Sequence, residues 1–210
     1  MQTTYFAYGT QEMNYLKQVD SRMKRLIEEL GFVERRVFPD LFQALVFAII
    51  GQQISVPASY AILDRLQSQM EVVPEVIQGK TIAELQACGL SRIKAEVIKR
   101  VADHMVEQSL QLEQLKQCSD TEVIEQLTAI KGLGLWSAQM ILIHCLERPN
   151  VMSFKDIAIK RGLCKLYELE ELTWELFEYY RSLFDPYNTV ASIYLWKYSA
   201  KDTPKIDLGS

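Results

Sequence analysis

Apolar residues recur with a helical period along most of this sequence, and no segment shows the polar–apolar alternation of a half-buried strand. In residues 20–30, Met23 and Leu26 fall on one helical face, and Gly31 ends the pattern. Residues 41–50 are apolar on almost every side, as expected of a helix at the centre of a domain. The sequence therefore predicts an all-α protein.

Helix-start signals divide the chain into about ten helices. The segments 81–84 (Thr-Ile-Ala-Glu) and 119–122 (Ser-Asp-Thr-Glu) are capping boxes. Pro57 suits the first turn of a helix, and a polar tail follows Lys201. The expected helices cover residues 20–30, 41–50, 57–70, 81–89, 91–108, 119 to the glycines near 132, 136–146, 157–167, 170–184 and 188–199.

The composition fits one globular unit, or two small lobes that share a core, since 49% of the 210 residues are apolar. The longest apolar run, at 41–50, is far shorter than the roughly 20 residues of a membrane span. The N-terminus lacks the basic start and apolar stretch of a signal peptide. The four cysteines form no Cys-x-x-Cys pair, and there are only two histidines. We therefore expect a cytoplasmic protein with free thiols, no zinc site and no membrane partner.

The net charge of −4 argues against a generally basic nucleic-acid binder, but the charges are unevenly distributed. Two basic clusters can hold phosphates locally, and each is also typical of a solvated helix face. The first cluster contains Arg92, Lys94, Lys99 and Arg100, and the second contains Lys155, Lys160, Arg161 and Lys165.

Gly132 and Gly134 form a two-glycine turn between two helical patterns. Glycines at this spacing permit positive φ and a close approach of another backbone. The N–H groups of such a turn, next to a helix N-terminus, make an anion site. An ordinary helix–helix turn explains the spacing equally well.

The residues around this turn add a hydrophobic signature, with Leu127 and Ile130 before it and Trp136 after it. The segment resembles the helix-hairpin-helix motif, which binds the DNA backbone through the amides of its hairpin. Here a lysine stands at 131, where that motif often has proline, and it adds a cation beside the phosphate. The resemblance implies DNA contacts at Lys131, Gly132, Leu133 and Gly134.

Asp156 lies twenty residues after Trp136, at the start of the next helical pattern. Taken alone, it is an adequate N-cap for that helix. The spacing matches the helix-hairpin-helix DNA glycosylase superfamily, in which an essential aspartate follows the motif. Three further segments, 41–55, 89–95 and 185–196, resemble the DNA-3-methyladenine glycosylase II family, and the similarity covers nearly the whole chain.

This resemblance implies a helix-hairpin-helix DNA glycosylase fold, with two helical lobes and the active site in the cleft between them. Residues 1–40 and 151–200 would form a discontinuous lobe that carries the aspartate. Residues 41–150 would form the lobe with the hairpin, at about 120–146. A polar tail, 201–210, would follow.

The resemblance also implies roles for individual residues, each with a plainer structural alternative. Asp156 would be catalytic, or only a cap. Trp136 and Trp196 would line the base pocket, where an indole face favours a cationic methylated purine, and Met140 would flank it; core packing is the alternative. Gln52 and Gln53 would fill the duplex position that the flipped base leaves, or bond a helix end. The expected site residues are therefore Asp156, Trp136, Trp196, Met140, Gln52 and Gln53, with the hairpin.

Departures from the superfamily pattern narrow the expected activity. Bifunctional members carry a nucleophilic lysine at the position of Trp136, and an indole cannot form a Schiff base, so we expect no strand cleavage by that route. The C-terminal part lacks the closely spaced cysteines of the iron–sulfur relatives, so we expect no cofactor and no iron–sulfur cluster. The chain before residue 20 is too short for the β-rich domain of larger alkylpurine glycosylases, and we expect Tyr5, Phe6 and Tyr8 to supply its pocket wall.

We therefore expect a monomeric, monofunctional DNA glycosylase of base excision repair. Its substrates would be alkylated purines in double-stranded DNA, 3-methyladenine and 7-methylguanine among them. The Asp156 carboxylate would stabilise the oxocarbenium character of the sugar. Two alternatives stay open: a superfamily glycosylase for a different lesion, and a non-catalytic helix-hairpin-helix DNA-binding module.

Overall fold

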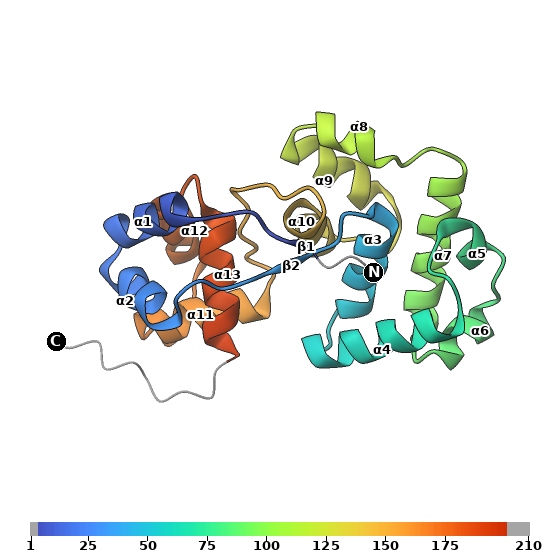
Figure 1. The fold of residues 1–210 in the computed structure, drawn as a ribbon, viewed down its shortest axis with the longest axis horizontal. Helices are drawn as coiled ribbons and strands as arrows, with labels where there is room; N and C mark the ends of the chain where they lie inside the picture. The colour runs from blue at the N-terminus through green and yellow to red at the C-terminus, as the bar shows by residue number, and fades with distance from the viewer. Residues whose placement is uncertain (1–3, 201–210) are drawn as a thin grey trace. The chain divides into compact units, whose positions relative to one another are not determined.

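The computed structural model describes residues 4–200, whose regular secondary structure is almost entirely helical (Figure 1). This part of the chain has thirteen helices and one short pair of strands, so the predicted all-α class is confirmed. None of these helices is long and apolar enough to cross a membrane. The elements are β1 (Thr4–Tyr5), α1 (Thr10–Val19), α2 (Ser21–Leu30), β2 (Arg36–Val37), α3 (Leu41–Gly51), α4 (Val56–Gln69), α5 (Pro74–Gln78), α6 (Ile82–Ala87), α7 (Arg92–Val106), α8 (Leu112–Gln117), α9 (Asp120–Ala129), α10 (Leu135–His144), α11 (Ile157–Tyr167), α12 (Trp174–Leu183) and α13 (Asn188–Ser199).

Three of these helices, α1, α5 and α8, are not predicted by the hydrophobic pattern. Helices α5 and α8 have only 5 and 6 residues, and each buries a single side chain, which is too little for a period to appear. Helix α1 buries only Leu16. Helix α12 begins at Trp174 and not at 170, because the Thr173 hydroxyl caps it by accepting from the Leu176 N–H at 3.3 Å.

The chain divides into two compact units, each with its own core. We call Val37–Leu146 with Thr4 the hairpin unit, and Tyr5–Arg36 with residues 147–200 the aspartate unit. The two divisions fall four residues earlier along the chain than the expected lobe boundaries. The expected polar tail, 201–210, lies outside the described residues.

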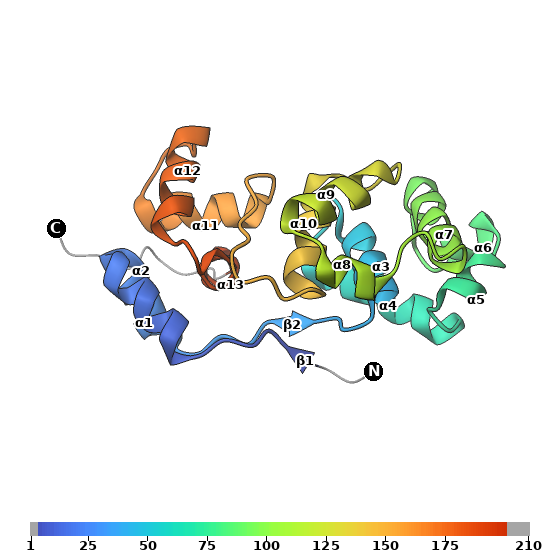
Figure 2. The same cartoon turned by 90° about the horizontal axis from the view of Figure 1, so that it is seen from above.

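Helix α3 is the central helix of the hairpin unit and packs against α4, α7 and α10 (Figure 2). Its sequence is apolar on nearly every side, so neighbouring helices can cover it all round. Leu45 and Ile49 are fully buried. Asp40 begins the helix by accepting from the Gln43 N–H at 2.8 Å. The buried helix predicted at 41–50 is thus confirmed.

Helix α13 has the corresponding place in the aspartate unit, where it packs against α11, α2 and α1. A Cβ added to Gly162 of α11 would lie 2.7 Å from the Leu195 carbonyl oxygen, so glycine is required for the close approach of these two helices. The Tyr194 hydroxyl donates to the Gly31 carbonyl at 2.9 Å and ties α13 to the end of α2.

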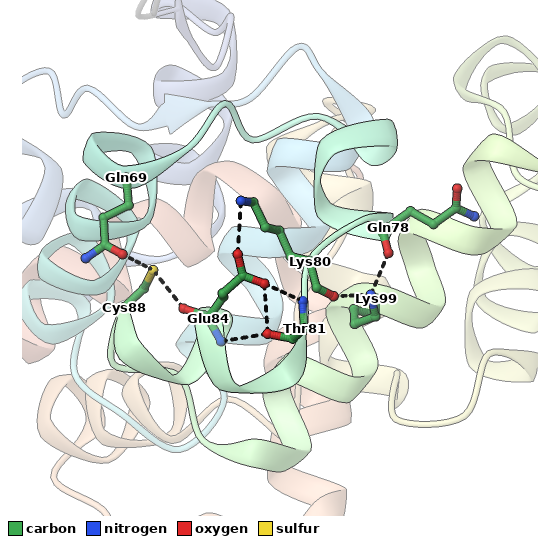
Figure 3. Close-up of polar contacts among 7 residues, drawn as sticks. All are labelled: Gln69, Gln78, Lys80, Thr81, Glu84, Cys88 and Lys99. Atoms are coloured by element: carbon green, nitrogen blue, oxygen red, sulfur yellow. Dashed lines mark hydrogen bonds and ion pairs between the residues drawn. The ribbon is translucent and has the colours of Figure 1, made fainter.

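Both predicted capping boxes are present. At the start of α6, the Thr81 hydroxyl accepts from the Glu84 N–H at 3.2 Å, and Glu84 Oε2 accepts from the Thr81 N–H at 2.8 Å (Figure 3). The Thr81 N–H and hydroxyl, with the Lys80 ammonium, lower the pKa of the Glu84 carboxyl to about 2. Ser119 and Glu122 form the same arrangement at the start of α9, which leads into the two-glycine turn.

Candidate functional site

The two-glycine turn joins α9 to α10 within the hairpin unit. Gly132 has φ of +104°, in the left-handed region, and the Leu133 N–H donates to the Ile130 carbonyl at 3.0 Å. Helix α10 follows at once, with Gly134 as its N-cap. The turn is therefore a compact connection between two helices.

The structure requires glycine at only one of the two positions. A Cβ added to Gly132 would lie 2.2 Å from Cγ2 of Val97, so the predicted close approach is to a side chain of α7. Gly134 has φ of −105°, and no atom lies within 4 Å of a Cβ built on it. Positive φ, which the two-glycine spacing permits, occurs at Gly132 but not at Gly134, because an N-cap residue adopts extended backbone.

The N-terminus of α10 is suited to an anion. Gly134 offers no side chain to the first turn of the helix, and no side-chain cap is formed. Lys131, Gly132 and Gly134 are exposed, and Leu135 is 42% exposed. Unbonded N–H groups and the helix dipole at such an end attract a phosphate. Leu133 differs from its neighbours, because its side chain is buried and anchors the turn in the core.

Gln52 and Gln53 follow α3 directly but have different surroundings. Gln52 Nε2 donates to the Gly132 carbonyl at 3.2 Å and to the Ser137 hydroxyl at 3.0 Å. These bonds match the helix-end alternative, and they connect the end of α3 to the two-glycine turn. Gln53 is exposed and has φ of +60°. Of the two side chains, Gln53 is the one that faces solvent.

Asp156 is the N-cap of α11 in the aspartate unit. Its Oδ1 accepts from the N–H groups of Ala158 at 2.9 Å and Ile159 at 3.0 Å, and the residue is 7% exposed. The predicted cap is confirmed. The two bonds fix the orientation of the carboxylate, and the N-terminus of α11 favours a negative charge there.

The segment before Asp156 is held by buried hydroxyl groups of α13. The Val151 N–H donates to the Thr189 hydroxyl at 3.0 Å, and the Ser192 hydroxyl donates to the Val151 carbonyl at 3.2 Å. Thr189 and Ser192 are both fully buried, where hydrogen bonds are electrostatically stronger than in water. The sequence gives these two residues no role of their own, although both lie in the 185–196 segment that resembles the glycosylase family, because their contacts with Val151 exist only once the chain has folded.

The expected pocket residues are distributed over both units. Trp136 and Met140 lie on α10 in the hairpin unit, and Trp196 lies on α13 in the aspartate unit. Trp136 is partly exposed, and its Cη2 lies 3.6 Å from a Cβ built on Gly51. Met140 and Trp196 are 5% and 8% exposed, as in the core packing that is their alternative role.

A cation lies over the ring of Trp196. The guanidinium carbon of Arg35 is 4.2 Å from the ring centroid, and both residues belong to the aspartate unit. A contact of this kind is worth roughly 0.5–2 kcal/mol, depending on how far the cation is desolvated. Arg35 is therefore a further residue that bears on this tryptophan, and no local sequence signal identifies it.

Three aromatic residues were expected to supply a pocket wall near the N-terminus. Tyr5 is 48% exposed, whereas Phe6 is buried. The Tyr8 ring stacks on Phe32 with centroids 4.7 Å apart, and its hydroxyl donates to the Val33 carbonyl at 2.6 Å. Burial raises the pKa of Tyr8. Phe6 and Tyr8 thus pack within the aspartate unit, and Tyr5 is the exposed member of the set.

The first basic cluster binds the protein's own backbone. Lys94 and Lys99 each donate to two carbonyl groups, and Arg100 donates to the Lys131 carbonyl. These three cations are therefore not a freely solvated helix face, and a phosphate contact by the cluster stays a prediction. Only Arg92 has the expected surface role, in an exposed ion pair with Glu96 at 2.9 Å.

The four cysteines are free thiols, as predicted. Within residues 4–200, no three histidine, cysteine, aspartate or glutamate side chains gather in a group that could hold a metal ion.

The family model described as "HhH-GPD superfamily base excision DNA repair protein" matches residues 46–186. The chain belongs to this helix-hairpin-helix superfamily. Within it, the chain is 30% identical over 197 residues to the DNA-3-methyladenine glycosylase 1 of Schizosaccharomyces pombe, covering 88% of this chain and 85% of that protein. The family resemblance found in the sequence is confirmed.

Solved structures confirm the fold class. The 3-methyladenine DNA glycosylase of S. pombe in complex with abasic DNA has a TM-score of 0.85 at 29% identity, covering 92% of this chain and 98% of the other. The DNA-3-methyladenine glycosidase of Bacillus halodurans has a TM-score of 0.77 at 35% identity, covering 94% and 93%.

Proposed function

We propose that this chain is a monofunctional DNA glycosylase that starts base excision repair by hydrolysing the N-glycosidic bond of alkylated purines. The substrates are 3-methyladenine and 7-methylguanine in double-stranded DNA. The observation that carries the proposal is the buried carboxylate of Asp156, fixed by two N–H donors at the start of α11, in a chain whose relatives are DNA-3-methyladenine glycosylases.

The chemistry of the substrate explains why one carboxylate suffices. Alkylation at N3 or N7 makes the purine cationic and therefore a good leaving group, so no strong general acid is needed. The sugar becomes positively charged as the bond to the base breaks, and the Asp156 carboxylate stabilises that charge and orients or deprotonates the attacking water. Its fixed orientation supports this role, because a preorganised group needs little rearrangement during the reaction.

The base must leave the helical stack before this step, at a cost of a few kcal/mol. We assign stacking of the flipped purine to Trp136 and Trp196, and a flanking contact with the purine to Met140. An electron-rich indole favours a cationic base by roughly 0.5–2 kcal/mol. We assign the vacated duplex position to Gln53, which its exposure supports, and the link from that position to the hairpin to Gln52.

The hairpin is assigned to the DNA backbone. Lys131, Gly132 and Gly134 are exposed beside the uncapped N-terminus of α10, which supports a phosphate at this point. Leu133 contributes by anchoring the turn through its buried side chain. Contacts of this kind bind damaged and undamaged DNA alike, because a phosphate carries no sequence information.

The proposed enzyme acts as a cytoplasmic monomer, without a cofactor and without lyase activity. The absence of lyase activity is supported by Trp136, which stands where bifunctional relatives have a nucleophilic lysine. Borohydride is therefore expected to trap no covalent complex with lesion DNA, and the product strand should break only on later treatment with alkali or heat. Efficient trapping that disappears when a nearby lysine is changed would overturn this point.

The decisive experiment measures single-turnover base release from duplexes that each carry one defined lesion. The proposal expects release of 7-methylguanine and 3-methyladenine, with cationic lesions preferred over neutral ones. Release of no base from any duplex that the protein binds would identify a non-catalytic DNA-binding module. Preference for an oxidised, deaminated or mismatched base would identify a glycosylase for another lesion.

A further inference from the structure

Lys94 on α7 is bonded to the end of the central helix of the hairpin unit. Its Nζ donates to the Ile50 carbonyl and to the Gln52 carbonyl, each at 2.8 Å. These two carbonyls belong to the last turn of α3 and to its C-cap, which have no partner within the helix itself. The ammonium group also places a positive charge at the negative end of the α3 dipole.

The charge of Lys94 stabilises the fold of the protein itself. Its ammonium group is partly removed from water where it donates to the two carbonyls, and this burial lowers the pKa of Lys94. The chain that it holds is the short turn at 50–53, in which Gln53 adopts left-handed backbone at φ +60°. Residues other than glycine rarely adopt this conformation, so the turn needs support from its neighbours.

The same turn is bonded to the hairpin. The Gln52 carbonyl accepts from Lys94 Nζ. The Gln52 side chain donates to the Gly132 carbonyl and to the Ser137 hydroxyl. Gly132 in turn packs against Val97, one helical turn after Lys94 on α7. Helix α7, the 50–53 turn and the hairpin therefore form one connected network inside the hairpin unit.

We propose that Lys94 is a positioning residue for base displacement. It holds the 50–53 turn so that Gln53 projects in a fixed direction from the surface that also carries the hairpin. Binding of the backbone and entry of Gln53 into the duplex then occur together. This inference rests on the proposed function, since it assumes that Gln53 enters the position left by the flipped base.

Lys99 provides a matched control on the same helix. Its Nζ donates to the Gln78 carbonyl at 2.6 Å and to the Lys80 carbonyl, at the end of α5 (Figure 3). The chemistry is the same as at Lys94, with one ammonium group on two carbonyls past a helix end. The position differs, because these carbonyls lie outside the 50–53 turn. Lys99→Met thus removes an equivalent pair of bonds without releasing Gln53.

The experiment compares wild type, Lys94→Met and Lys99→Met as full chains. Thermal melting, affinity for undamaged duplex and single-turnover release are measured, using the alkylated purine that wild type excises fastest. The lesion is placed either in a normal base pair or opposite a run of unpaired bases. Fluorescence of a 2-aminopurine next to the lesion reports extrusion.

We expect both variants to melt at similarly lowered temperatures. Lys94→Met alone should release the paired lesion about thirtyfold more slowly, equivalent to about 2 kcal/mol of barrier, with a matching loss of the extrusion signal. Release of the unpaired lesion should change less than about threefold, because that base needs no displacement. Equal rates for Lys94→Met and Lys99→Met on the paired lesion would overturn the inference, as would an equal loss on both substrates.

Gln53→Ala keeps the inference testable even if Lys94→Met does not fold, because Gln53 is exposed. It should show the same selective loss on the paired lesion, and the double variant should be no slower than the slower single one, since both act through one step. Full wild-type rates for Gln53→Ala would contradict the inference. Failure of the proposed function gives a different result, in which wild type itself releases no alkylated purine.

Discussion

The two units use their cationic side chains in different ways. In the hairpin unit, cations of α7 donate hydrogen bonds to backbone carbonyls. Lys94 and Lys99 each donate to two carbonyls, and Arg100 donates to the Lys131 carbonyl. In the aspartate unit, cations lie over aromatic rings in addition to binding carbonyls: Arg22 donates to the Leu166 carbonyl at 3.0 Å and Lys165 to the Tyr198 carbonyl at 3.4 Å. Arg35 lies 4.2 Å from the ring centroid of Trp196, Lys160 lies 3.7 Å from that of Phe154, and Lys165 lies 4.3 Å from that of Tyr198.

This difference suits the two tasks that we propose. A carbonyl-bound ammonium fixes the path of a loop, and a hairpin that grips phosphate needs a fixed path so that its N–H groups keep their direction. A cation over a ring adds its charge to the electrostatics of the aromatic face. We propose that the hairpin unit holds the DNA backbone and that the aspartate unit supplies the carboxylate that acts on the sugar.

Replacing Asp156 by asparagine should have the largest effect of any single change in either unit. Asparagine keeps the capping acceptor for Ala158 and Ile159, so the melting temperature should hardly move. Excision should fall by roughly a thousandfold or more, because the charge that stabilises the sugar is gone. DNA affinity should stay the same or rise, since an anion has been removed near phosphates. Single-turnover release measures the excision rate, and fluorescence anisotropy measures the DNA affinity. Excision within about tenfold of the wild-type rate would show that Asp156 is not catalytic.

Trp196→Ala should act on the base and not on the backbone. Loss of an aromatic stacking partner is worth roughly 1–3 kcal/mol, so single-turnover rates should fall about tenfold or more while affinity for undamaged duplex stays unchanged. Because Trp196 is 8% exposed, the variant should also lose stability, and rates are compared well below its melting temperature. Trp174→Ala, at a residue of the same unit that is 54% exposed, is the control. Wild-type rates for a folded Trp196→Ala variant would show that Trp196 serves only core packing.

Substitution of the two hairpin glycines should affect different properties, stability at Gly132 and DNA binding at Gly134. Gly132→Val should destabilise the fold by about 2–4 kcal/mol, because its Cβ meets Val97 and its φ is positive. Gly134→Val meets no atom within 4 Å, so it should fold nearly as well as wild type and bind both damaged and undamaged duplex about tenfold less tightly. Thermal melting and anisotropy distinguish the two. Unchanged affinity in Gly134→Val would mean that DNA does not approach this glycine.

Features with local signals could be predicted from the sequence. The capping boxes at 81–84 and 119–122, the apolar run at 41–50 and the cap at Asp156 each depend on residues within one or two helical turns. They lead directly to the all-α class and to the two segments on which the proposed function depends. Short helices such as α5 and α8 are missed because they contain too few residues for a period.

Features that depend on packing could not be predicted. The sequence identifies Gly132 as special, but its contact with Val97 exists only once α7 lies against the hairpin. The lysines of α7 have the sequence pattern of a solvated face, and their carbonyl partners become apparent only when α3 and α5 are in place. The contact between Arg35 and Trp196 joins opposite ends of the chain.

Arg35→Met tests whether a ring-bound cation of the aspartate unit influences substrate choice, and its effect should be the smallest. Methionine has a similar length and still packs on the Trp196 indole, so stability should change little. The guanidinium repels a cationic base brought to the same tryptophan, an interaction of about 1 kcal/mol once solvent screening is included. Its removal should raise the release of 7-methylguanine relative to neutral hypoxanthine about fivefold, while Arg35→Lys should leave the ratio unchanged. Single-turnover rates on the two duplexes measure this ratio. An unchanged ratio in Arg35→Met would limit the role of Arg35 to holding the Trp196 indole in place.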